Sequence, residues 1–139
     1  MATFYKFYGF IEAVFEKKHD FSSDQFKVLL TNTAPSLSWT QKSDVTGELT
    51  TGNGYTSGGT NLTLTSCTQS TGLLTVIFSD LVFTGTGSGF GPFRYAVIFN
   101  ETATNDLLVG YYDYQYGISV GAQTFTLDLN QSSGFLYAT

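Results

Sequence analysis

The residues able to act as acids, nucleophiles or metal ligands are few and widely spaced along this chain. It has one histidine, His19, and one cysteine, Cys67, and the acidic residues of its second half stand singly. Catalysis requires such groups to be brought together. The sequence also lacks the HxxE, HExxH and CxxC spacings that present ligands to zinc. It therefore predicts a protein that is not an enzyme, with no catalytic residue, no metal site and no cofactor.

The isolated reactive residues have structural interpretations as well. His19 follows the charged run 16–18, which predicts a solvent-exposed helix end. Cys67 lies in a strand-like run, where the expected role is that of a small buried apolar side chain. Asp106 and Asp128 lie near predicted loop ends, but neither belongs to an Asp-rich, Gly-containing loop of the kind that binds calcium.

The glycine-rich tract 85–91 does not meet the requirements of a phosphate-binding loop. It has no Gly-Lys-Ser/Thr ending, and Phe90 takes the place of the last glycine in a GxGxxG pattern. Pro92 and a predicted strand follow, whereas a phosphate cradle requires the N-terminus of a helix. We expect a flexible connection between strands that a partner could order.

The composition indicates a small β-rich structural or binding domain. Of 139 residues, 12% are charged and 17% are aromatic, and the net charge is −5. One arginine and five lysines are too few to line a phosphate backbone, and they disfavour an anionic membrane for the same reason. No apolar run approaches the roughly 20 residues that span a bilayer, and the N-terminus has no secretory signal pattern. We expect a single domain, residues 1–139, made in the host cytoplasm, with neither nucleic acid nor membrane as partner.

Residues 1–20 predict a helical contact segment, and residues 21–139 predict a β-sandwich. Apolar residues recur at helical spacing from Phe4 to Phe15 with Thr3 as N-cap, although Gly9 weakens a helix and the aromatic start is equally typical of a strand. A single helical turn is expected within 43–49. Short strand-like runs bounded by turn residues indicate a mainly β fold, an antiparallel β-sandwich or barrel of jelly-roll type with a short N-terminal helix. The predicted strands are 26–31, 61–69, 73–84 with a break near Asp80, 92–100, 107–116, 123–129 and 134–138.

The strands 92–100 and 107–116 predict a hairpin with an ion pair across it. If the turn centres on residues 102–104, Arg94 falls opposite Asp113 or one residue away. Aromatic residues surround both positions, so the pair is expected to be a structural anchor, with ligand binding as the alternative.

Aromatic residues of the N-terminal segment and the glycine-rich loops are predicted to contact other proteins, because aromatic surfaces with few charges are typical of interfaces. An aromatic stripe is also typical of a core, and the sequence leaves both interpretations open. Trp39, in a polar loop after Pro35, is expected to cover one end of the sandwich. The predicted interface residues are Phe4, Tyr5, Phe7, Tyr8, Tyr55 and Phe90.

Several segments resemble a group of small tailed-bacteriophage virion proteins. The resemblance covers nearly the whole chain, and its motifs are structural. It implies a virion component, with a capsid cement or decoration protein as the best-supported role. It further implies attachment to the major capsid protein and to copies of itself, as a trimer at local symmetry axes on the capsid surface. The segments are FYKF (4–7), EKKH (16–19), KVLLTNTAP (27–35), GNGYTSGG (52–59), GPFRYAV (91–97), YYDY (111–114) and FTLD (125–128).

Two alternatives remain at the level of sequence. The first is another virion role, as a tail, head–tail adaptor or fibre-associated protein, because no motif separates these from a cement protein. The second is a carbohydrate-binding module, in which Trp39 and Tyr112 would stack on sugar rings.

Overall fold

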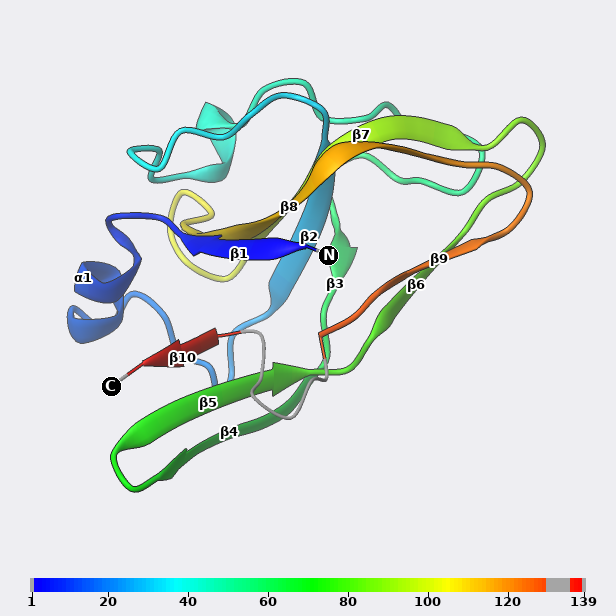
Figure 1. Cartoon of the computed structure of the whole chain (residues 1–139). Helices are drawn as coiled ribbons and strands as arrows, with labels where there is room; N and C mark the ends of the chain where they lie inside the picture. The colour runs from blue at the N-terminus through cyan, green and yellow to red at the C-terminus, as the bar shows by residue number, and fades with distance from the viewer. Residues whose placement is uncertain (1, 130–135, 139) are drawn as a thin grey trace.

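The computed structural model describes residues 2–129 and 136–138, and it is mainly β, with antiparallel sheets and one short α-helix (Figure 1). The helical elements are α1 (Phe10–Phe15) and a 3₁₀ turn, η1 (Lys42–Asp44). The strands are β1 (Thr3–Lys6), β2 (Phe26–Thr31), β3 (Thr60–Asn61), β4 (Leu64–Ser70), β5 (Leu73–Phe78), β6 (Leu81–Thr84), β7 (Phe90–Asn100), β8 (Leu108–Val120), β9 (Thr124–Leu127) and β10 (Leu136–Ala138).

A five-stranded sheet forms the centre of the molecule, in the order β1-β8-β7-β2-β3. A three-stranded sheet, β10-β5-β4, and a two-stranded sheet, β6-β9, lie below it in Figure 1. The described strands thus form a sandwich-like arrangement of open sheets and not a closed barrel.

The central strands β2 and β7 are buried on both faces. Because side chains alternate along a strand, Val28 and Leu30 face the core shared with β5, β6 and β9, whereas Leu29 faces the opposite side. The second face is covered by the loop after β2, through Trp39 and Val45. Figure 1 shows this loop, in cyan, passing over β7 and β8. The sheet therefore has one face covered by strands and the other covered by a loop.

The N-terminal segment differs from the predicted helix. Its first part is the edge strand β1, which pairs with β8 from Thr3↔Asp113 to Lys6↔Gly110, and only Phe10–Phe15 is helical. The ring of Phe4 lies 5.0 Å from that of Tyr112, and a Cβ at Gly110 would collide with the Phe4 ring. Pairing with a strand more than 100 positions away thus overrides the local helical spacing.

The strand predictions for the rest of the chain are largely confirmed. The break near Asp80 separates β5 from β6, while the run predicted as 61–69 is divided between β3 and β4. The strand predicted as 107–116 ends too early, because β8 continues to Val120. The helical turn predicted within 43–49 is present only as η1. The start of the last predicted strand, 134–138, lies outside the described residues.

The ion pair predicted between Arg94 and Asp113 is present and bidentate. Arg94 Nε lies 2.8 Å from Asp113 Oδ1, and Arg94 Nη2 lies 3.0 Å from Asp113 Oδ2. The ladder is irregular here, since Phe93 pairs with Ile118 whereas Tyr95 pairs with Asp113. These hydrogen bonds hold the pKa of Asp113 below its ordinary value, and the N–H of Gln115 also donates to this carboxylate. The pair therefore connects β7 to β8 at the bulge in their ladder.

Candidate interaction surface

Apolar side chains that face solvent gather on and next to α1. Phe15 is 85% exposed, Tyr8 is 74% exposed, and Ile11 is 36% exposed. Ile11 and Phe15 are four residues apart and therefore lie on one helix face, and Tyr8 lies three residues before Ile11, in the turn that precedes α1. Phe10 and Ala13 occupy the opposite face and are buried. We name Tyr8, Ile11 and Phe15 the α1 surface.

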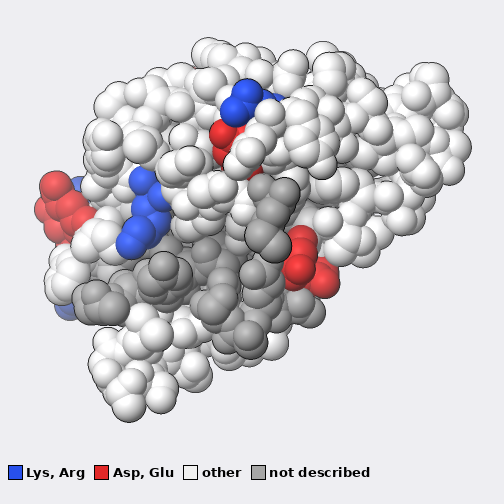
Figure 2. All heavy atoms as spheres, viewed as in Figure 1, with Lys and Arg blue, Asp and Glu red and all other residues white. Residues whose placement is uncertain are grey.

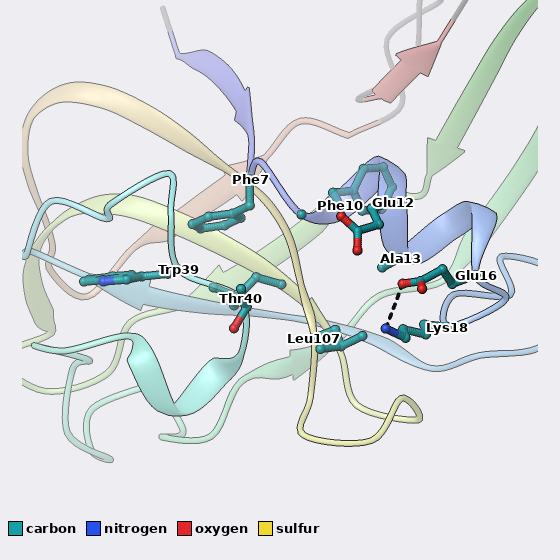
Figure 3. Close-up of a pocket in the computed structure, with 11 residues that line it drawn as sticks. Phe7, Phe10, Glu12, Ala13, Glu16, Lys18, Trp39, Thr40 and Leu107 are labelled. Carbon is teal, nitrogen blue, oxygen red and sulfur yellow. Dashed lines mark hydrogen bonds and ion pairs between the residues drawn. The ribbon is translucent and has the colours of Figure 1, made fainter.

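A pocket of about 190 Å³ lies along the flank of α1. Phe10, Ala13 and Leu108 form its apolar floor. Figure 3 shows Phe7 and Trp39 at one end and the charged residues at the other, where Lys18 Nζ lies 2.8 Å from Glu16 Oε1. The pocket thus combines an apolar floor with a charged rim.

The end of α1 turns the chain back toward the sheet. Lys17 adopts a left-handed backbone with φ of 60°. The N–H of Lys17 donates to Val14 O, and the N–H of Lys18 donates to Ala13 O, which is the pattern of a Schellman motif. As a result His19 enters the interior beneath the helix and does not continue it.

His19 is buried, so its predicted solvent exposure is wrong. Only 6% of the residue is exposed, and its ring packs against three aromatic rings. One comes from α1, one from the turn that follows, and one from β2: Phe10, Phe21 and Phe26, with centroids 5.2, 6.4 and 6.1 Å away. The ring therefore joins the N-terminal segment to the core.

Asn100, at the end of β7, determines which nitrogen of His19 carries the proton. Its Oδ1 accepts the N–H groups of Thr102 and Ala103, which fixes the orientation of the amide. Asn100 Nδ2 therefore donates to Asp24 Oδ2 at 2.7 Å and to His19 Nδ1 at 3.1 Å. His19 Nδ1 is thus an acceptor, and in the neutral ring the hydrogen is on Nε2.

This arrangement favours a neutral His19. Burial lowers the pKa of His19 to about 4, against the smaller and opposite effect of the Asp24 carboxylate. Protonation of Nδ1 would place two donors against each other at Asn100. Within the described part of the chain, His19 Nε2 has no hydrogen-bond partner. The geometry and the pKa therefore agree that acid weakens this junction.

The structure separates the predicted interface residues into two groups. Tyr5 and Tyr8 are exposed and Phe4 is partly buried, so their role at an interface stays a prediction. Phe7, Tyr55 and Phe90 are buried in the core, so their assignment to a surface is corrected. Aromatic type alone did not distinguish the two groups, because the buried Phe7 and the exposed Tyr8 are neighbours in the same aromatic segment.

Tyr55 shows why a loop aromatic becomes a core residue. Its hydroxyl accepts the N–H of Leu30 and donates to Glu48 Oε1 at 2.8 Å. Glu48 also accepts the N–H of Gly58. Burial raises the pKa of Tyr55. The side chain thus joins the loop after η1 to β2.

The burial of three further residues decides whether the role predicted for each from the sequence holds. Cys67 is exposed on β4, which contradicts the prediction of a buried thiol, because β4 lies at the edge of its sheet. Trp39 is half-buried and packs on the second face of the central sheet, not at an end of the sandwich. Tyr112 is 7% exposed and packs in the core, so it does not present a ring for sugar stacking.

The surface carries few charges in the view of Figure 2, where most described side chains are uncharged. No group of three or more potential metal ligands occurs among the described residues. No helix in this part of the chain has the length and apolar character needed to cross a membrane. The candidate site is therefore an apolar surface and not a cluster of reactive groups.

No family model, curated protein or solved structure matches the chain. The geometry defines a mainly β chain with an exposed apolar helix face. Its resemblance to phage virion proteins stays a prediction from the sequence.

Proposed function

We propose that the chain is a structural virion protein of a tailed bacteriophage, a cement or decoration protein that attaches to the head shell by protein–protein contacts. The observation that carries this proposal is the α1 surface. Phe15 and Tyr8 leave most of their area in water, and a contiguous exposed apolar patch is typical of a protein-binding site.

The way in which α1 is held supports the proposal. The buried face of the helix packs on the sheet through Phe10 and Ala13. The ring of His19 packs against Phe10 and so holds the turn after α1 against the helix. The exposed face is therefore presented on a supported element, which lowers the entropy lost on docking. Many copies on one shell would multiply a modest affinity for each copy.

Add-back of purified chain to particles assembled without it tests this role. We expect the wild-type chain to co-sediment with the particles, and Phe15→Ser to lower its affinity by at least about tenfold, because exposed aromatic residues are frequent hot spots. Tyr116→Ser is the matched control, since Tyr116 is 63% exposed on β8, away from α1.

Gold labelling of the bound chain distinguishes the virion roles. Label over the whole head supports a cement protein, whereas label at one vertex or along the tail replaces it with an adaptor, tail or fibre-associated role. Equal affinities of wild type and Phe15→Ser would exclude the α1 surface as the contact. A wild-type chain that does not bind the particles would overturn the proposed function.

A further inference from the structure

Strand β4 is the longest edge strand in the described part of the chain. It has seven residues, whereas the edge strands β1, β6 and β9 have four each, β10 has three and β3 has two. β4 pairs with β5 on one side, and no described strand pairs with its other side. In Figure 1 it lies at the lower margin of the molecule, with no element drawn beyond it.

This edge has none of the charges that usually prevent association. Between Glu48 and Arg94 the sequence has one charged residue, Asp80. Natural edge strands are commonly protected by lysine, proline, inward-pointing charges or bulges; Leu64–Ser70 has no charge and no proline, and its one bulge lies at the start of the strand, between Leu64 and Ser66. The residues Thr65 and 67–70 are exposed. The edge is therefore accessible, uncharged and able to pair.

The turn after β4 determines which backbone groups face outward. Thr71 and Gly72 have φ of 52° and 84°, as in a two-residue type I′ hairpin turn. Ser70 and Leu73 flank this turn and form its hydrogen-bonded pair, and such pairs alternate along an antiparallel ladder. Cys67 and Gln69 therefore direct their N–H and C=O groups away from β5, toward the free edge.

We infer that β4 pairs with β4 of a second copy of this chain, antiparallel and about a twofold axis at Cys67. This register is centred on Cys67, the middle residue of the strand, and is regular from Ser66 to Thr68, because the bulge of β4 lies between Leu64 and Ser66. It places Ser66 opposite Thr68 and Thr65 opposite Gln69, so that every pair is uncharged. A twofold contact is self-complementary, and identical uncharged edges meet it without repulsion. The inference concerns a surface other than α1 and does not rest on the proposed function.

The mass of the free chain in solution, in the absence of any particle, tests the inference. We expect the reduced wild type to form a dimer by sedimentation equilibrium, and Gln69→Pro to raise the dimer dissociation constant by at least about tenfold. Proline at position 69 removes an outward N–H and leaves the bonds to β5 in place. Gln69→Lys, which keeps the N–H and adds a charge, is expected to dissociate the dimer as well. Thr126→Lys, on exposed β9, is the matched control.

Cross-linking tests the register. A short bis-maleimide adds one thiol to each of its two alkenes, and we expect it to link Cys67 of one copy to Cys67 of the other. Cys67→Ser should remain a dimer but not cross-link. A wild type that is monomeric at high concentration would overturn the inference. A dimer that withstands both Gln69 variants, with unchanged circular dichroism, would also overturn it and assign dimerisation to another surface.

Discussion

Two of the polar contacts between elements of the fold, Arg94–Asp113 and His19–Asn100, differ in depth. Arg94 and Asp113 bridge adjacent strands near the surface, where the Arg94 side chain is 39% exposed. His19 and Asn100 join the N-terminal segment to the end of β7 in the interior. The first contact holds two charged groups in partial contact with water, whereas the second holds a neutral ring and an amide away from water.

The difference in depth decides how each contact responds to change. Water screens a surface ion pair and replaces a lost partner. A buried donor or acceptor without a partner bears the full cost of desolvation. We therefore expect the His19–Asn100 junction to dominate the stability of the N-terminal segment and its response to acid. The Arg94–Asp113 pair should mainly set the geometry of the bulge in β8.

The largest expected effect is that of Asn100→Ala. Asn100 is fully buried, and its amide bonds the backbone of the following turn, Asp24 and His19. Removal of the amide leaves several of these groups unpaired, so we expect a loss of roughly 4 kcal/mol in the free energy of unfolding, measured by urea denaturation. The exposed Asn61→Ala serves as control, with an expected change within about 0.5 kcal/mol. Similar losses for both variants would contradict the importance of the buried junction.

The second effect is the pH dependence that His19 produces. The pKa of His19 is about 4 in the folded chain, against 6.5 ordinarily. The unfolded chain therefore binds this proton first as the pH falls, and stability is lost between about pH 6.5 and 4. The expected loss is about 3 kcal/mol, since one pKa unit corresponds to about 1.4 kcal/mol.

His19→Gln keeps an acceptor for Asn100 but does not titrate, so it isolates this contribution. Denaturation of both chains across the pH range should give a difference in slope confined to the window between pH 6.5 and 4. Equal slopes for wild type and variant would mean that His19 is not held neutral by burial.

The smallest effect is expected at the surface pair. In Arg94→Gln the pKa of Asp113 should rise toward its ordinary value of 3.8, because the hydrogen bonds from the guanidinium that lower it are lost. An NMR titration of the Asp113 carboxyl measures this shift. Lys27→Gln, which removes a different pair with Glu101, should leave Asp113 unchanged. An Asp113 pKa unaffected by Arg94→Gln would assign its lowering to the backbone N–H of Gln115.

Local patterns in the sequence were enough to predict most strands from 26 to 127 and the Arg94–Asp113 pair, although they ended β8 too early and did not divide β3 from β4. Short alternating runs between turn residues specify strands, and a hairpin turn fixes the register across it. The exposure of Tyr8 and the burial of Tyr55 followed no such pattern. Both are aromatic residues next to a glycine, and only contacts with distant elements separate them.

Composition and local spacing determined that this chain is mainly β and poor in charge, because strand formation and turns depend on neighbouring residues. The tertiary structure alone decided that residues 3–6 form a strand, that His19 is buried and that Cys67 is exposed. Each of these depends on a pairing or packing partner far away in the sequence, such as β8 for β1 and Asn100 for His19. Burial is a property of the assembled fold, so residue type and local spacing do not encode it.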